Sequence, residues 1–320
     1  NNYEQSLEIQ KAGLQALYHQ CISSMNAESN KRSLIESQLD SGQKGLDVIL
    51  SLFNTPLRDD RTSMTWLCRL LWVLTSNDDV LKSVSRARYI MENTVAICHA
   101  NGAHQDSGDL MEAAFGIIAN MAHVESNRSI LLQLQIVPII LETMDYHPRE
   151  LPLNQEACSA LGNLAGSPDL SAAIYDREGV DLVLNALNDH LETEGLVSEA
   201  FRVLVCLSVC VEESKGIIAS PKNVQLIVEA SSEHQESKTI QEQCCKLLAS
   251  LSTVGDLNES LVSNGCLDII FSALEYQASD NILDAACAAL RNLCCQSHDS
   301  DEMLRRGALK TLIQAMAKNE

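Results

Sequence analysis

The sequence predicts an all-α fold in which a three-helix unit is repeated along the chain to form a right-handed α-solenoid. Two markers recur with a common period of about 43 residues, and aromatic residues make up only 4% of the 320-residue chain. The chain also lacks the sustained alternation of apolar and polar residues that is typical of strands. A period of this length indicates helical repeats that bury their apolar faces against one another.

The first marker is the end of an apolar helix, as in ACSALGNLA around Asn163. Aligning similar segments on that asparagine gives spacings of 43, 43, 44 and 42 residues, and looser copies upstream add spacings of 47 and 54. We call the aligned site the marker position, and its regular occupants are Asn120, Asn163, Cys206, Ser250 and Asn292. The second marker is an apolar segment that begins at Val137, Val180, Val224, Leu267 and Leu309.

Residues 1–108 are expected to form irregular repeats with enlarged loops. Apolar periodicity predicts helices near 8–22, 30–39, 45–53, 61–75 and 89–99. Two stretches interrupt the pattern and are expected to be loops, at 54–60 and at 101–108, because they are polar and contain proline or glycine.

Residues 109–320 are expected to form regular repeats, each with a long helix, a short helix and a second long helix. The short helices are predicted near 127–134, 169–176, 213–219, 257–264 and 301–306. Turn signals agree with these boundaries, because Ser167-Pro168 precedes one short helix and Asn264-Gly265 follows another. We therefore expect one continuous domain over residues 1–320.

The blocks NQEACSALGNLAGSPDLSAAIYDREGVDLVLNAL and ILDAACAALRNLCCQSHDSDEMLRRGALKTLIQAM resemble armadillo repeats of the kind found in β-catenin, importin α and many adaptors. The resemblance covers residues 8–320 and is strongest from about 109 onward. It implies about six to seven armadillo repeats with three helices each. It also implies that the third helices line a concave groove for an extended peptide or helical segment of a protein partner.

The resemblance implies that an asparagine near the end of each third helix bonds the backbone of the ligand, and Asn120, Asn163 and Asn292 match that position. A carboxamide has both a donor and an acceptor, so a row of them can pair with a strand of any sequence. The alternative is that each asparagine only closes its own helix end by bonding local backbone.

Importin α carries a tryptophan four residues before that asparagine, whereas this chain has Gly116, Ser159 and Ala288 there. Recognition of nuclear-localisation signals in that manner is therefore not expected. In the other repeats the same row holds cations, namely Arg69, Arg202 and Lys246. They are either solvated surface residues or cations of the groove that select the charge of the partner.

The chain is strongly acidic, with a net charge of −20. The imbalance grows from −7 over residues 1–160 to −13 over residues 161–320. A nucleic-acid partner bound through its phosphates is therefore not expected. The acidic surface either keeps an apolar repeat protein dispersed or attracts a basic segment of a partner.

The twelve cysteines occur mostly within apolar helical motifs, where cysteine acts as a small hydrophobic residue, and no CxxC pair is present. These features favour a reducing compartment, and we expect a cytoplasmic protein. No apolar run is long enough to span a bilayer. The chain begins with Asn1 rather than Met, so peripheral membrane tethering would depend on an N-terminal segment outside the given residues.

The sequence contains no phosphate-binding loop, nucleotide-binding glycine motif, nucleophile elbow or HExxH motif. We expect no catalytic residues, no cofactor and no metal, and the polar loop around His99 and His104 is interpreted as an ordinary loop.

The predicted function is a non-catalytic protein-interaction scaffold. One alternative is a regulator or chaperone-like armadillo protein that engages a small GTPase, a myosin or a polybasic client through its acidic surface. Another is a purely structural module of a larger assembly.

Overall fold

The computed structural model describes residues 2–23, 26–38, 42–275 and 280–295, together with Arg305, Gly307 and Ile313. Within these residues the regular structure is helical, and the one β-type contact is an isolated bridge between Gln38 and Lys44. The predicted all-α class is confirmed. The chain divides into two compact units, residues 1–164 and 165–320, which we call unit 1 and unit 2 and describe separately.

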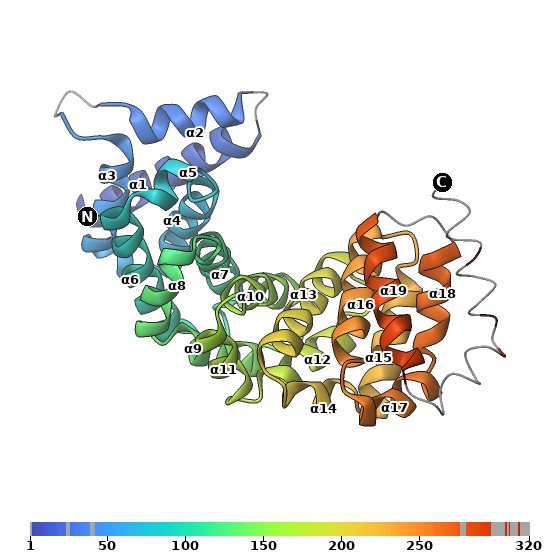
Figure 1. Cartoon of the computed structure of the whole chain (residues 1–320). Coiled ribbons are helices and arrows are strands. Elements are labelled where there is room, and N and C mark those ends of the chain that lie inside the picture. Colours follow the sequence, from blue (N-terminus) through green and yellow to red (C-terminus); the bar gives the residue numbers. More distant parts are fainter. Residues whose placement is uncertain are drawn as a thin grey trace. The chain divides into compact units, whose positions relative to one another are not determined.

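Unit 1 is a series of helix triplets preceded by one long helix (Figure 1). Its elements, in which η denotes a 3-10 helix, are α1 (Asn2–Ile22), α2 (Ala27–Glu36), α3 (Gly45–Ser51), η1 (Leu52–Asn54), η2 (Pro56–Asp59), α4 (Arg61–Leu74), α5 (Asp78–Lys82), α6 (Val84–Asn101), α7 (Gly108–His123), α8 (Glu125–Gln133), α9 (Ile136–Tyr146) and α10 (Leu151–Leu164). The last helix of each triplet is the third helix. The third helices α4, α7 and α10 pack against one another in series, and α1 packs on α4.

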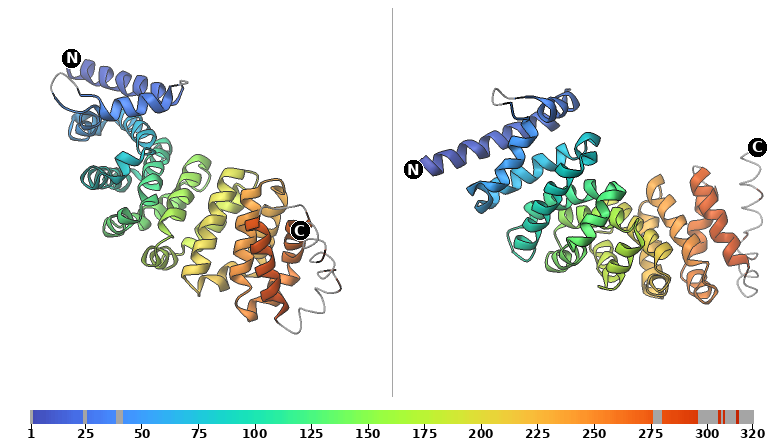
Figure 2. Two further views of the ribbon diagram at one scale, coloured as in Figure 1. Left: turned by 45° about the horizontal axis from the view of Figure 1, so that its top comes forward. Right: turned by 60° about the vertical axis from the view of Figure 1, so that its left-hand side comes forward.

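Unit 2 continues the same pattern with three further triplets among its described residues. Its elements are α11 (Pro168–Tyr175), α12 (Gly179–Asp189), α13 (Glu194–Cys210), α14 (Ser214–Ile218), α15 (Pro221–Glu233), α16 (Lys238–Leu251), η3 (Gly255–Leu257), α17 (Asn258–Ser263), α18 (Cys266–Glu275) and α19 (Asp280–Cys294). The third helices α13, α16 and α19 again pack in series. Both views of Figure 2 show the yellow to red helices of this unit side by side.

The third helices bury many of their residues, and α4, α7 and α16 each pack against a helix on both sides. In α7 the run from Ala113 to Ala119 is buried at every residue. Phe115 in unit 1 and Phe201 in unit 2 are the two largest fully buried side chains of the described chain. Burying a side chain of this size stabilises the fold by roughly 1.5–3 kcal/mol, so third-helix packing carries much of the stability.

Four of the predicted short helices are confirmed, as α8, α11, α14 and the pair η3 and α17. The fifth, at 301–306, and the marker residue Leu309 lie outside the described residues apart from Arg305. The helix predicted at 89–99 is longer and begins at Val84, and the short helix α5 before it was missed. Both errors have one cause, since charged residues at 78–88 obscure the apolar period.

The loop predicted at 54–60 is wrong in part, because η1 and η2 fold most of it. Pro56 begins η2, and the Oγ1 of Thr55 accepts a hydrogen bond from the N–H of Leu57 at 3.4 Å. Leu57 is only 1% exposed. A single buried leucine thus anchors a segment that is otherwise polar.

All twelve cysteines are free thiols. Burial raises the pKa of Cys68 and of Cys244 to about 12, so these thiols stay protonated at neutral pH. Cys287 and Cys294 belong to the apolar motif of α19 but are exposed. The reason is that α19 is the last helix in the described part of unit 2, so no described third helix covers that face.

We expect Asp60→Ala to lower the free energy of unfolding by about 1 kcal/mol, the usual cost of removing a helix cap. The Oδ2 of Asp60 accepts a hydrogen bond from the N–H of Ser63 at 2.8 Å at the start of α4. Hydrogen bonding by Ser63 lowers the pKa of the Asp60 carboxyl. A lowered folded-state pKa means that this stability is complete above the unfolded pKa of about 4. It is lost as the pH falls through the folded pKa.

Urea unfolding followed by circular dichroism at pH 7 and at pH 3 measures both effects. The matched control is Ser83→Ala, because Ser83 precedes α6 but its side chain makes no capping hydrogen bond. Equal destabilisation by the two substitutions would contradict the assignment of Asp60 as a functional cap.

Candidate functional site

The marker asparagines of unit 1 join neighbouring third helices. Asn163 in α10 donates its Nδ2 to the carbonyl oxygen of Ala119 in α7 at 2.8 Å. Asn120 in α7 donates its Nδ2 to the carbonyl oxygen of Trp72 in α4 at 3.0 Å and to Thr75 Oγ1 at 3.0 Å. Each acceptor carbonyl lies one residue before the marker position of the preceding third helix, so the bond repeats with the period of the fold.

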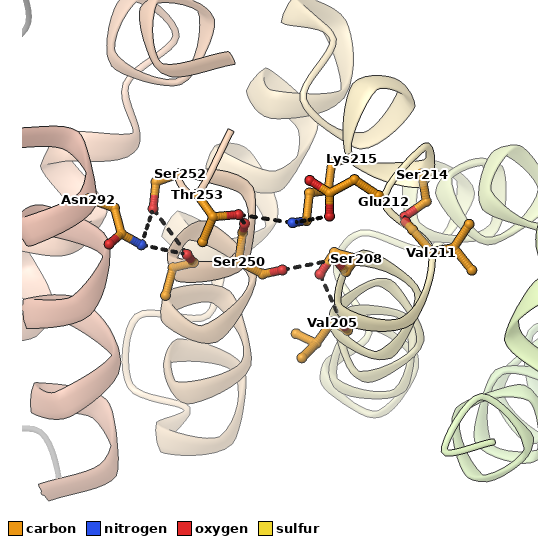
Figure 3. A network of polar contacts seen from close by, with 11 residues as sticks. Val205, Ser208, Val211, Glu212, Ser214, Lys215, Ser250, Ser252, Thr253 and Asn292 are labelled. Carbon is orange, nitrogen blue, oxygen red and sulfur yellow. Dashed lines mark hydrogen bonds and ion pairs between the residues drawn. The ribbon is translucent and has the colours of Figure 1, made fainter. Parts of the chain in front are cut away.

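Unit 2 uses the same connection (Figure 3). Asn292 in α19 donates its Nδ2 to the carbonyl oxygen of Ala249 in α16 at 3.1 Å and to Ser252 Oγ at 3.4 Å. At the preceding marker position, Ser250 Oγ donates to the carbonyl oxygen of Ser208, near the end of α13, over 3.1 Å. A serine therefore substitutes for asparagine, although its shorter side chain contacts a different carbonyl.

The carboxamide nitrogens of Asn120, Asn163 and Asn292 donate to the preceding third helix, which neither of the two interpretations of the sequence included. The carboxamide oxygens differ in this respect. In the described part of the chain, no donor lies within hydrogen-bond distance of Oδ1 of Asn120 or Asn292. These two residues can still offer one acceptor to a partner.

The three predicted cations all lie beside carboxylates. Lys246 donates its Nζ to Glu242 Oε1 at 2.6 Å, one turn away on α16. Arg202 donates its Nε to Glu199 Oε2 at 2.8 Å on α13. Their positive charges are therefore compensated within the protein. To bind either cation, a carboxylate of an acidic partner would have to replace Glu242 or Glu199.

Arg69 has the most elaborate surroundings of the three. Its Nη2 lies 3.6 Å from Asp109 Oδ1 and 3.9 Å from Glu112 Oε2, both on α7. Its guanidinium carbon lies 5.2 Å from the centre of the Trp66 ring. Burial raises the pKa of the Glu112 carboxyl, and Arg69 opposes this shift. Arg69 thus connects two third helices within unit 1.

Gly116 is one of the three positions at which importin α would carry a tryptophan, and its surroundings leave no room for a large side chain. The indole ring of Trp72 in α4 covers Gly116 in α7, and a β-carbon at that position would overlap the ring. Along one face of α7, residues 112, 116 and 120 meet residues 69 and 72 of α4 and the residue 75 that follows it. The space that a larger side chain at Gly116 would need is therefore filled by Trp72 of the preceding third helix.

Unit 2 carries an open groove of about 780 Å³ that is bordered by α13, α14, α16 and α19. Lys246 and Asn292, two of the predicted site residues, lie on it together with the marker residue Ser250. Its apolar lining includes Val209, which is 68% exposed. An exposed apolar side chain between polar groups suits a segment with mixed chemistry.

Sequence reasoning missed Lys215 in α14, which also lines the groove. This lysine is only 7% exposed, and its Nζ donates to Glu212 Oε2 at 2.7 Å and to Thr253 Oγ1 at 2.9 Å. Figure 3 shows it between α14 and the end of α16. A lysine on a short helix normally indicates a solvated side chain, so only the packing of Lys215 against the end of α16 shows its burial.

The six predicted site residues are divided between the units. Arg69, Asn120 and Asn163 belong to unit 1, and Arg202, Lys246 and Asn292 belong to unit 2. Only Lys246 and Asn292 line the described groove. Among the described helices, none is both long enough and apolar enough to cross a membrane.

Comparison with known proteins places this geometry in context. The family model of the LRRK2 ARM repeat matches residues 43–310. Armadillo repeat-containing protein 6 of Homo sapiens is 22% identical over 200 residues, which cover 56% of this chain and 40% of that protein. The protein of the same name from Pongo abelii is 22% identical over 199 residues with the same coverage. The chain thus matches less than half of the length of these relatives.

Solved structures show the same fold. An engineered protein from the Northeast Structural Genomics Consortium matches with a TM-score of 0.64 and 18% identity, over 78% of this chain and 97% of that chain. A chain from a study of a phosphorylation switch that controls the interaction between cadherin and beta-catenin matches with a TM-score of 0.66 and 15% identity, over 88% of this chain and 59% of that chain. The armadillo fold expected from the sequence is confirmed.

We expect Asn163→Ala to lower the free energy of unfolding by about 1 kcal/mol, because one hydrogen bond between repeats is lost. Chemical unfolding of the full chain measures the change. The control is Asn188→Ala, since Asn188 is exposed and, among the described residues, donates to the adjacent Asp189 at 3.3 Å. If the two substitutions lower the free energy of unfolding equally, the hydrogen bond between repeats does not contribute to stability.

We expect Gly116→Ala to destabilise the protein by about 1–3 kcal/mol, because the added methyl group overpacks the contact with Trp72. The control is Gly13→Ala, which has open space around the new methyl group in α1. It should gain up to about 1 kcal/mol from helix propensity. Thermal unfolding of both variants shows whether each substitution lowers or raises the stability. A stabilised Gly116→Ala variant would contradict the packing described for Trp72.

Proposed function

Because this chain belongs to the LRRK2 ARM repeat family, we propose that it is a non-catalytic scaffold that binds a segment of a protein partner on its third-helix surface. The observation that carries the proposal is the groove of about 780 Å³ on α13, α14, α16 and α19. Its polar residues and the exposed Val209 give it the mixed lining that protein interfaces use. The proposal places the scaffold in the cytoplasm, in keeping with twelve free thiols.

The partner segment would bind by two kinds of contact. Its backbone N–H groups would donate to carboxamide oxygens, in unit 2 to Oδ1 of Asn292. Its apolar side chains would pack on Val209 and on the small residue Ala288 of the groove. Asn120 and Asn163 would provide corresponding polar positions on the third helices of unit 1.

The cations would select the charge of the partner. Lys246 is 42% exposed in its side chain, whereas its partner Glu242 is 23% exposed. An acidic group of the partner would compete with Glu242 for this ammonium, and Arg202 and Arg69 would act in the same manner on their own surfaces. Exposed ion pairs contribute only about 0–1 kcal/mol, so such an exchange costs little.

The acidic character of residues 161–320, with a net charge of −13, supports a second candidate. A regulator or chaperone would use that surface to engage a basic client such as a small GTPase or a myosin. Charge reversal of exposed acidic residues outside the groove should weaken binding of such a client, whereas it should leave a groove-bound segment in place.

The groove is tested best by substitutions that keep the bonds between repeats, since alanine at Asn292 would also disturb the fold. We expect Val209→Gln with Ala288→Gln to reduce capture of at least one partner roughly tenfold, because apolar contacts at the centre of an interface dominate its affinity. Quantitative mass spectrometry of proteins captured from cell extract by the full chain gives the readout. The control is Tyr146→Gln in α9 of unit 1, a site that is 50% exposed.

All variants must first show the wild-type helical spectrum and melting temperature. A partner lost only from the groove variant identifies the client and supports the scaffold. An unchanged set of partners would overturn the groove proposal, and no specific partner for any form would favour a purely structural module.

A further inference from the structure

We propose that unit 1 carries an aromatic docking site for a proline-rich segment of a partner protein. The site lies where α1 packs on α4, and we call its four side chains the aromatic cluster: Tyr18, His19, Trp66 and Arg69. The cluster shares no residue with the groove of unit 2. Its test is therefore separate from the test of that groove.

The rings of the aromatic cluster lie close together without stacking face to face. Tyr18 and Trp66 meet edge to face with ring centres 5.6 Å apart, and His19 lies 5.9 Å from Trp66 in a tilted contact. Each of the three side chains is partly or fully exposed. Ile22, one turn beyond Tyr18 on α1, is 45% exposed. Exposed aromatic and aliphatic groups gathered in one place are typical of anchor points in protein interfaces.

The polar atoms of the two largest rings are donors that remain open to water. Tyr18 Oη and Trp66 Nε1 form no hydrogen bond with any residue in the described part of the chain. Neither atom is among the buried polar atoms that lack a partner, so both are accessible to solvent. The phenol O–H and the indole N–H can therefore donate to a ligand without breaking a bond inside the protein.

Arg69 adds further donors beside the indole. The carboxylates of Asp109 and Glu112 lie 3.6 Å and 3.9 Å from its Nη2, and Arg69 makes no hydrogen bond to a residue that the structure describes. The Nε of Arg86, by contrast, donates to a carboxylate at 3.1 Å. The guanidinium of Arg69 lies over the Trp66 ring at 5.2 Å, and its side chain is 25% exposed. It can donate to a carbonyl that approaches the indole.

A surface of apolar rings and open donors favours a ligand that offers apolar surface and acceptors. Proline has no backbone N–H, and the carbonyls of a polyproline II helix make no internal hydrogen bonds. Segments of other composition also present N–H groups, which this surface matches poorly. An acidic segment is disfavoured as well, because Asp109 and Glu112 already lie beside Arg69. A proline-rich segment meets each of these conditions.

The spacing of the helices agrees with this occupant. Packed helices lie about 8–10 Å apart, and α1 packs directly on α4. A polyproline II helix repeats after about three residues, or roughly 9 Å, whereas a β-strand repeats on one face after roughly 7 Å. A proline-rich segment that crosses the two helices therefore places one ring near Tyr18 and another near Trp66. The six prolines of the chain itself are dispersed, so a partner supplies the segment.

The direct test is a titration of the full chain with decaproline, followed by NMR of the indole N–H groups. The chain has two tryptophans, Trp66 and Trp72, and Trp66→Phe assigns their signals. We expect a saturable shift of the Trp66 signal and none of the Trp72 signal, because the Trp72 ring is packed on Gly116. A flexible Gly-Ser peptide of equal length should cause no saturable shift. An unchanged Trp66 signal, or an equal response to the Gly-Ser peptide, would overturn the proposal.

Variants assign the binding to the aromatic cluster. Tyr18→Phe keeps the ring and its packing but removes one donor, and it should weaken decaproline binding about fivefold, the effect of one hydrogen bond. Trp66→Phe removes a donor and part of the ring, and it should weaken binding at least about tenfold. Isothermal titration calorimetry measures the affinities.

The matched control is Tyr146→Phe in α9, because Tyr146 is 50% exposed and also meets a histidine edge to face, His147, with ring centres 4.9 Å apart. This variant should bind decaproline as the wild type does. Tyr18→Phe must retain the wild-type melting temperature, which keeps the test valid even where Trp66→Phe lowers stability. Wild-type affinity in the Tyr18→Phe variant, or an equal loss in the control, would contradict the site.

A titration with decaglutamate separates this site from the selection of acidic partners proposed for Arg69. We expect decaglutamate to shift the Trp66 signal at least about tenfold less tightly than decaproline, since the nearby carboxylates repel it. Equal or tighter binding of decaglutamate would overturn the proline-rich site. Either result leaves the groove of unit 2 as a separate question.

Discussion

The hydrogen bond from a marker side chain to a carbonyl of the preceding third helix is the interaction on which this architecture depends. The last four carbonyls of a helix have no partner within that helix. Trp72 and Ala249 carry such carbonyls near the ends of α4 and α16. Each accepts from a hydroxyl three residues later, of Thr75 or Ser252, and also from Asn120 or Asn292 of the next repeat. The bond therefore meets a local need of the backbone and at the same time fixes how far one third helix slides along another.

The same constraint shapes the surface that a partner would meet. The carboxamide nitrogens of Asn120 and Asn292 donate between repeats, so Oδ1 is the atom that each of these two residues can offer to a partner. The packing of Trp72 on Gly116 excludes a larger side chain at that position. Charge is compensated in the same way, since Lys246 is held by Glu242 on its own helix. Structural and binding requirements thus act on the same few residues.

The repeat could be predicted from the sequence because every unit buries the same apolar positions, which leaves a period in the residue pattern. Details that depend on a single contact produce no repeating pattern and could not be predicted in this way. The start of α6 at Val84 was missed because charged residues obscure the period, and the fold of 54–60 depends on one buried leucine, Leu57. The spacing of about 43 correctly predicted which repeats are neighbours. It could not show which carbonyl each asparagine meets or that Lys215 is buried by the next repeat.

The serial packing of third helices within each unit has a thermodynamic consequence. A helix such as α16 is connected by marker bonds only to its two neighbours, α13 and α19. Its free energy is therefore close to a sum of its own folding and two interface energies, as in a one-dimensional chain of coupled elements. Local opening would begin at an outermost repeat and spread inward one boundary at a time, and amide protection would form a gradient along each unit.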